Sequence, residues 1–340
     1  LARRLSPSIL AAPVSRMSSS PKQGRRLSHE GHHQHHPRPV REQITDMNSL
    51  SKPIEKQHPE RSAMTAPAER AGDGMAAAWM LAKREWVRFF RQRNRVTAAV
   101  VQPLLFWVLF GTGLSGAFQS AGELDFLKFF LPGTLALIVL FTAIFSTISV
   151  IEDRREGFMQ AVLVAPVGRW PVLVGKVMGG AAIAWVQALF FLALVLLIGT
   201  AAPGWSLIPL LGLLALVAVA MCALGMIVAW PMESTQGFHA IMMLGLMPMW
   251  LLSGTFFPIP ALGADASVGQ WILGAMMRAN PLSYSMVELR RLLFPQIDFS
   301  ASGFSPSSPV CWAITVIATV LALMLAWRLM SGSRKVDVIV

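Results

Sequence analysis

Six long apolar segments dominate the chain after residue 95, and shorter polar segments separate them. Each apolar segment is long enough for a transmembrane helix, which needs about 20 mostly apolar residues. The chain does not show the polar and apolar alternation that the strands of a membrane β-barrel require. The pattern therefore predicts an all-α polytopic membrane protein with six transmembrane helices, at about 97–117, 129–151, 174–199, 207–230, 237–257 and 309–329.

An amphipathic segment precedes the first predicted span. Between residues 75 and 95, Trp79, Trp86 and Phe90 fall on one face of a helix. The basic residues of this segment include Lys83, Arg84, Arg88, Arg91 and Arg95. We expect an N-terminal helix that lies in the membrane interface. The alternative is an ordinary basic flank of the first span.

A charged island at residues 152–176 separates the second and third predicted spans. No charged residue occurs in 129–151 or between Lys176 and Glu233. Because dense charge is costly inside hydrocarbon, we expect a structured loop at one membrane face. Within it, Phe158 and Val162 lie four residues apart, a spacing that gives a short helix an apolar face.

The connection between the fifth and sixth predicted spans, residues 258–308, is more than a simple loop. Residues 271–294 hold two short apolar stretches, which Asn280 and Pro281 separate. Each stretch is too short to cross a bilayer. We therefore expect two interfacial or re-entrant helices here.

The distribution of positive charge predicts the orientation of the spans. Of the 17 Lys and Arg residues after residue 75, 13 fall on one side if both termini are cytoplasmic. Cytoplasmic loops carry an excess of Lys and Arg, so this topology is favoured. The island at 152–176 is then cytoplasmic.

Composition separates a polar extension from the membrane domain. The whole chain is 54% hydrophobic and only 14% charged, against about 25% charged residues in a soluble domain. Residues 1–75 lack apolar periodicity and are predicted to be disordered, whereas 76–335 form the membrane domain. The extension resembles a transit peptide superficially; a reading frame extended upstream of Met64 or Met75 is the preferred explanation.

Several motifs that suggest chemistry lack the context that the chemistry needs. The GxGxxG at 111–116 ends an apolar span, and the glycines of 168–175 are spaced wrongly for a phosphate-binding loop. The sequence therefore predicts no catalytic residue and no ATP or cofactor site in this chain. The histidines at 32–36 lack an accompanying ligand framework, so no metal site is predicted.

The remaining candidates are structural or isolated. Gly175 and Gly179 form a GxxxG that favours close helix packing. His239 lies near the start of the fifth span. It is a functional candidate because ionisable residues inside membrane spans are usually functional. Cys222 and Cys311 are expected to be small buried residues. The net charge of +11 divides into +5 in residues 1–75 and +6 in the rest, where the basic residues flank the spans as topology determinants do, and this argues against a nucleic-acid partner.

Four features, taken in order, resemble the membrane subunits of type-2 ATP-binding-cassette (ABC) exporters. They are Pro132-Gly133, the island at 152–176, Leu252–Pro258, and Asn280–Tyr284 followed by Arg290. Together they extend over residues from about 80 to 330. The resemblance is slightly closer to daunorubicin-resistance permeases than to lipo-oligosaccharide exporters.

This resemblance implies that the island is a coupling helix that docks on a separate ATP-hydrolysing subunit. ATP and magnesium would bind to that partner, and this chain would not be an enzyme. The implied coupling residues are Asp153, Arg154, Arg155, Glu156, Gly157, Phe158, Met159 and Val162. The four charged residues among them would pair with charges on the partner.

The resemblance also implies a second permease subunit, identical or homologous, and a shared pathway for an amphiphilic drug, lipid or glycolipid. The location would be a bacterial inner membrane, among its lipids. The implied exit gate and pathway consist of Leu252, Ser253, Gly254, Phe256, Phe257, Pro258, Trp271, Asn280, Pro281 and Tyr284.

Two other classes of protein compete with an export permease. An ion-coupled secondary transporter normally has charged or broken helices near the midplane and repeated halves, but the third to fifth spans are almost free of charge. A membrane-embedded enzyme needs polar catalytic groups that converge at depth, and the sequence predicts none. The export permease subunit is therefore the preferred hypothesis.

Overall fold

The structure is a computed structural model that describes residues 71–113, 126–164, 168–199, 201, 204–260, 266–297 and 304–332. These residues all belong to one compact unit, Thr65–Val340. The predictions for residues 1–70, including the histidines at 32–36, lie outside the described residues. The first described helix begins at Ala71, inside the segment 1–75 that was predicted to be disordered.

Every regular element in the described part of the chain is helical, which confirms the predicted all-α class. The elements are α2 (Ala71–Arg91), α3 (Arg93–Gly113), α5 (Phe126–Ser146), α6 (Ile148–Arg155), α7 (Phe158–Val164), α8 (Arg169–Ile198), η2 (Gly204–Ser206), α9 (Leu207–Ala229), α10 (Thr235–Trp250), η3 (Leu251–Thr255), α11 (Val268–Ala279), α12 (Pro281–Leu293) and α13 (Ser308–Gly332).

Five helices among the described residues are long and apolar enough to cross a membrane, where the sequence predicted six. They correspond to the second to sixth predicted spans, and α5 with α6 counts as one continuous span, Phe126–Arg155. The first predicted span falls on α3, whose apolar part is the shorter stretch Val101–Gly113. Residues 114–117 of that prediction lie outside the described residues.

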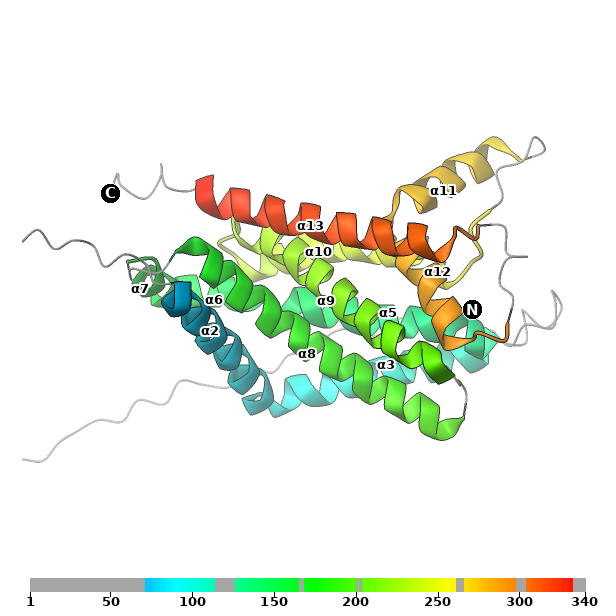
Figure 1. The fold of residues 1–340 in the computed structure, drawn as a ribbon, viewed down its shortest axis with the longest axis horizontal. Coiled ribbons are helices and arrows are strands. Elements are labelled where there is room, and N and C mark those ends of the chain that lie inside the picture. The colour runs from blue at the N-terminus through cyan, green and yellow to red at the C-terminus, as the bar shows by residue number, and fades with distance from the viewer. Residues whose placement is uncertain are drawn as a thin grey trace, which may run out of the picture. The chain divides into compact units, whose positions relative to one another are not determined.

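Three helices form the centre of the bundle. α5, α8 and α9 pack against one another, and α13, α3 and α2 cover α9, α5 and α8 respectively (Figure 1). Most of α5 is buried, and its residues 129–140 carry large apolar side chains into the core. α10 packs less extensively, and only a third of its most apolar window is buried.

The connections gather at opposite ends of this bundle. α6 and α7 form a corner at one end, whereas α11 and α12 lie at the other, with α11 projecting outward (Figure 1). The predicted break at Asn280-Pro281 is confirmed. Asn280 is the N-cap of α12, with Pro281 in the first turn. This position suits proline, whose missing N–H has no partner within the helix there.

Candidate functional site

The corner between α6 and α7 is a sharp turn at Gly157. Its φ is +76°, in the left-handed region that glycine adopts without steric cost. The backbone N–H of Gly157 donates to the carbonyl of Arg154, so the turn closes directly on the last residues of α6. A structured loop was expected at 152–176, and its described residues include two short helices joined by this turn. Ala165–Val167 lie outside the described residues.

Asp153 anchors the corner to α2. Its side chain is fully buried, and its two oxygens accept hydrogen bonds from Arg84 at 2.7 and 2.8 Å. Arg88 adds a bond of 3.0 Å to Asp153 and one of 2.6 Å to Glu152. This bidentate, charge-assisted arrangement fixes orientation as well as distance. The bonds to Asp153 raise the pKa of Arg84.

Lys176 brings α8 into the same network. Its ammonium group is almost completely buried and contacts both Asp153 and Glu85, with Ser149 Oγ at 3.3 Å. A buried ammonium group is tolerated when it is paired and hydrogen-bonded on several sides. We call the set Arg84, Glu85, Arg88, Glu152, Asp153 and Lys176 the charged hub; it joins α2, α6 and α8.

Small residues let α2 approach α8 closely beside the hub. A Cβ atom added to Gly175 would lie 2.6 Å from the backbone oxygen of Ala78, and one on Gly179 would lie 3.0 Å from Cα of Ala82. The GxxxG of α8 thus serves helix packing, as predicted. The hub and this close contact hold α2, α6 and the start of α8 together.

Fewer residues of the corner are exposed than the sequence suggested. Arg155, Glu156 and Gln160 are exposed. Arg154 instead turns inward: it donates to the carbonyl of Trp230 at 2.6 Å and lies over its ring. Asp153 is fully buried and Arg154 is partly buried, so neither is placed to pair with a partner's charge as expected. Arg155 also donates to the Glu233 carbonyl, at 3.0 Å, but its side chain remains exposed.

The apolar face of α7 also points into this chain. Met159 is 2% exposed, and Phe158 and Val162 pack partly buried against the core. The guanidinium of Arg84 lies 3.8 Å from the centre of the Phe158 ring. These three side chains attach α7 to the bundle and leave its polar face free.

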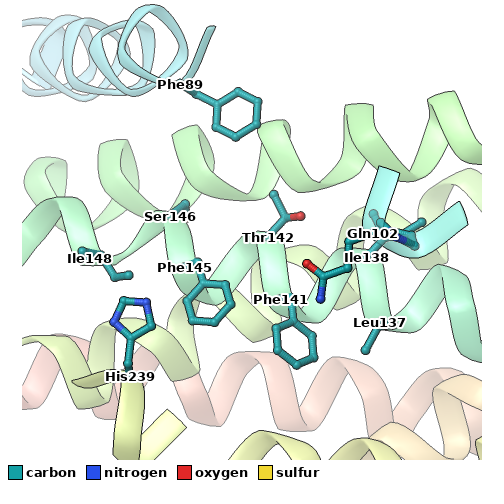
Figure 2. Close-up of a pocket in the computed structure, with 11 residues that line it drawn as sticks. Phe89, Gln102, Leu137, Ile138, Phe141, Thr142, Phe145, Ser146, Ile148 and His239 are labelled. Carbon is teal, nitrogen blue, oxygen red and sulfur yellow. The ribbon is translucent and has the colours of Figure 1, made fainter. Parts of the chain in front are cut away.

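A cavity of about 240 Å³ opens on the side of α5. Figure 2 shows its wall, which α2, α3, α5, α6 and α10 supply. Aromatic and aliphatic side chains dominate it, with a few polar groups, a composition typical of small-molecule sites. The lining comprises Phe89, Gln102, Pro103, Leu137, Ile138, Phe141, Thr142, Phe145, Ser146, Ile148 and His239.

His239 contributes the ionisable group of this lateral cavity. Its ring stacks on that of Phe145, with the two centroids 5.1 Å apart; both side chains are labelled in Figure 2. One ring nitrogen lies 2.8 Å from the carbonyl oxygen of Thr235. The structure therefore places the sequence candidate at the wall of a cavity, on the exposed side of α10.

At the opposite end of the bundle, α10 ends in a π-helical turn, η3. Gly254 there has a φ of +85°, and Pro248 interrupts the preceding helical hydrogen bonds. Arg290 of α12 donates to the Gly254 carbonyl and lies 4.0 Å from the Phe129 ring centre. Such turns often occur at functional positions in helices.

Three of the four motifs that carry the resemblance, Pro132-Gly133, Leu252–Pro258 and the motif from Asn280 to Arg290, meet at this turn. Asn280 donates to the carbonyl of Met249 at 2.6 Å, and Ser283 donates to that of Leu252 at 3.2 Å. A Cβ atom on Gly133 would overlap the side chain of Thr255. Residues 132–133, 252–258 and 280–290 are therefore neighbours in space, whereas from the sequence only their order along the chain was known.

An aromatic cluster surrounds Phe256. Its ring lies 5.1 Å from those of Phe130 and Trp250 and 5.6 Å from that of Phe110. The edge-to-face geometry of two of these pairs is favourable. Together these rings fill the space between α3, α5 and the end of α10.

Other predicted gate residues lie apart from this cluster. Phe257 and Trp271 are 61% and 48% exposed, Pro258 is exposed, and Tyr284 packs edge-on against Phe304. Ser253 is fully buried, where its hydroxyl donates to a backbone carbonyl. The structure thus brings together only part of the predicted exit gate.

Sequence reasoning missed Glu85 and the inward role of Lys176. A signal was present: Glu85 is four residues from both Leu81 and Phe89, on the buried stripe of an otherwise basic helix. An acid at such a position predicts a buried cation opposite. The identity of that cation depends on the packing of α8, which periodicity does not give.

The membrane-length helices define a multi-pass membrane protein, with a charged corner at one end of its bundle and a broken-helix turn at the other. The sequence comparisons identify the kind. The profile of ABC-2 type transporters matches residues 76–294, more than half of the chain. The chain belongs to the ABC-2 type transporter family, and such membership implies partnership with an ATP-binding subunit.

Two relatives agree with this assignment. The chain is similar to the transport permease ycf38 of Cyanophora paradoxa, with 24% identity over 264 residues, which cover 75% of this chain and 89% of the relative. It is also similar to the daunorubicin resistance ABC transporter permease protein DrrB1 of Streptomyces coeruleorubidus. That similarity is 26% identity over 206 residues, or 59% of this chain and 69% of the relative.

Proposed function

We propose that this protein is the membrane subunit of an ABC exporter that moves an amphiphilic substrate, such as a drug, lipid or glycolipid, out of the cytoplasm. A separate subunit would bind ATP with magnesium and hydrolyse it. This chain would supply the pathway and receive the force, and it would not itself be an enzyme.

The observation that carries the proposal is the build of the corner. Its exposed edge, with Arg155, Glu156 and Gln160, offers charges to a partner, while Asp153 ties the same turn to α2 and α8. A push on α7 would therefore reach three helices at once. A loop that merely faced water would not need a fully buried carboxylate with three cationic partners.

The lateral cavity supports an amphiphilic substrate. Its aromatic side chains, including Phe141 and Phe145, suit an apolar body, whereas His239 and Gln102 offer hydrogen bonds to a polar group. The name of the Streptomyces relative links that protein to daunorubicin resistance. A planar, partly polar amphiphile is consistent with this lining.

We further propose that a second permease subunit covers this side of the bundle. The cavity is open there, and α10 exposes Ile241, Met243 and Leu244. A second copy, or a homologue, would enclose the cavity between two chains. The aromatic cluster around Phe256 would then close the outer end of the pathway, near the turn that Arg290 holds.

The proposed setting is a bacterial inner membrane with both termini in the cytoplasm. The excess of Lys and Arg on the side of α2 and the corner favours this orientation. It also puts the corner in the compartment that contains ATP.

Reconstitution with the matched ATP-binding subunit tests the proposal. Proteoliposomes that contain both proteins, with the corner facing the ATP-containing medium, should accumulate members of a panel of fluorescent amphiphiles only when ATP is hydrolysed. A partner that carries a substituted P-loop lysine serves as the control. ATP hydrolysis or uphill transport by this chain alone would contradict the proposal.

A further inference from the structure

The outward face of α2 mixes apolar and basic side chains. Met75, Trp79, Met80, Val87 and Phe90 are between 49% and 71% exposed. The opposite face, with Ala78, Leu81 and Phe89, is buried against the bundle. An amphipathic helix with exposed aromatic and basic residues, continuous with an apolar helix such as α3, is suited to a membrane surface.

A basic groove runs along this face towards the corner. It has a volume of about 690 Å³ and is lined by Met80, Lys83, Arg84, Val87, Arg88, Arg91, Gln92 and Glu156. Four of these side chains are cationic and one is anionic. The groove therefore attracts anions.

The carboxylates of the hub pair with only two of these four cations. Arg84 and Arg88 bond to Asp153 and Glu152, but Arg88 reaches Glu156 only at 3.8 Å. Lys83 and Arg91 are exposed, and no acidic group of the described residues forms an ion pair with either. Two cations at the rim are thus available to a ligand.

We propose that this groove is a binding site for the headgroup phosphate of an anionic phospholipid. Lys83 and Arg91 would contact the phosphate. The guanidinium of Arg88, on its side towards Glu156, would lie beside the phosphate. The acyl chains would lie along the exposed apolar side chains of α2. An acidic protein segment would use the cations but not the exposed Trp79, Met80, Val87 and Phe90, so the lipid is the better match.

The probe is phosphatidylglycerol brominated on its acyl chains, incorporated at a low fraction into phosphatidylcholine vesicles that contain the full chain. Trp79 is the reporter, and its contribution is the fluorescence difference between the chain and its Trp79→Phe variant. We expect brominated phosphatidylglycerol to quench this contribution more than the same fraction of brominated phosphatidylcholine does.

The double variant Lys83→Gln, Arg91→Gln should reduce the preference for phosphatidylglycerol by on the order of tenfold. The reason is that each Lys or Arg at a membrane surface strengthens the binding of anionic lipid by several-fold. The charge-conserving pair Lys83→Arg, Arg91→Lys and the variant Arg328→Gln, at an exposed cation on α13, should retain it. Since all these side chains are exposed, the variants should fold.

Equal quenching by both lipids, or a preference that survives the double glutamine substitution, would overturn the proposal. So would a double variant that keeps its lipid preference but loses affinity for the ATP-binding subunit in detergent, because the groove would then be a protein-docking surface. The lipid measurement uses this chain alone, so its outcome is independent of whether the chain exports an amphiphile.

Discussion

Asp153 is the residue on which the arrangement of the charged corner depends most. It is the carboxylate that Arg84, Arg88 and Lys176 share, and it has no exposed surface. When one partner of a buried ion pair is removed, the other charge remains buried without a counter-charge, and this destabilises the folded protein strongly. The hub is therefore sensitive to the loss of any one member.

Replacing Asp153 with Asn should destabilise the protein by about 3–5 kcal/mol, since Lys176 and Arg84 would lose their shared counter-charge while remaining largely in place. Thermal unfolding of the purified chain in detergent measures this. The control Glu156→Gln removes a nearby carboxylate whose side chain is 60% exposed, and its effect should stay within about 0.5 kcal/mol. Equal unfolding temperatures for the two variants would contradict the importance of the hub.

Individual residues also mark the limit of sequence reasoning. The charged stretch 153–156 was recognised as a unit, but the sequence did not reveal that two of its members turn inward. Arg154 and Arg155 are adjacent and identical in type, and both donate to backbone carbonyls just after α9: Arg154 to Trp230 at 2.6 Å and Arg155 to Glu233 at 3.0 Å. They differ in burial, since Arg154 is partly buried and Arg155 is exposed. That difference depends on where α9 ends in space, which is a tertiary feature.

The contact between α2 and α8 connects the N-terminal amphipathic helix to the bundle. Gly175 and Gly179 face Ala78 and Ala82, and the approach leaves no room for a side chain. Close approach of helix backbones through small residues is a common mode of association in membranes. This contact holds α2 against α8, while Arg84 and Arg88 hold α2 directly to the corner.

Gly175→Ala should cost about 1–3 kcal/mol, because its Cβ would meet the backbone oxygen of Ala78 at 2.6 Å, and backbone cannot rotate away. Gly212→Ala in α9 is the matched control. Its Cβ would meet only Trp312 at an ordinary 3.8 Å, and alanine's higher helix propensity should leave stability unchanged or slightly raised. Unfolding in detergent would compare the two, and a neutral Gly175→Ala would contradict the packing described here.

Elements were easier to predict than their contacts. Hydropathy gave the second to sixth spans within a few residues, and the Asn280-Pro281 pair marked the boundary between α11 and α12 correctly. The first predicted span is described only in part: α3 begins with polar residues and its described apolar stretch is Val101–Gly113, whereas residues 114–117 lie outside the described residues. The meeting of Gly133, Gly254 and Arg290 at the outer turn could not be predicted, because hydropathy carries no information on which helices are neighbours.

The orientation of the whole protein leads to a further prediction. Both native cysteines are buried, so an introduced cysteine can report on one position alone. Gln160→Cys at the exposed corner should react with a membrane-impermeant maleimide in inverted vesicles and remain unlabelled in intact cells. Phe257→Cys, at a side chain that is 61% exposed at the other end, should show the reverse. Labelling of Gln160→Cys in intact cells would contradict the proposed topology.

The exchange of force between subunits is tested most directly by reversing the two exposed charges of the corner, Arg155→Glu with Glu156→Arg. The ATPase activity of the partner subunit would be measured in the reconstituted complex, with and without transported substrate. Like charges placed opposite each other disfavour docking strongly. The membrane helices should remain intact, because both side chains are exposed and the double reversal removes only the bond from Arg155 to the Glu233 carbonyl and the 3.8 Å pair of Glu156 with Arg88.

We expect the double reversal to reduce substrate-stimulated ATP hydrolysis by on the order of tenfold or more, while unfolding in detergent is unchanged. Arg328→Gln, at another exposed cation, should retain stimulation. Full stimulation of the partner by the reversed corner would contradict the claim that ATP hydrolysis acts on this protein through the α6–α7 turn.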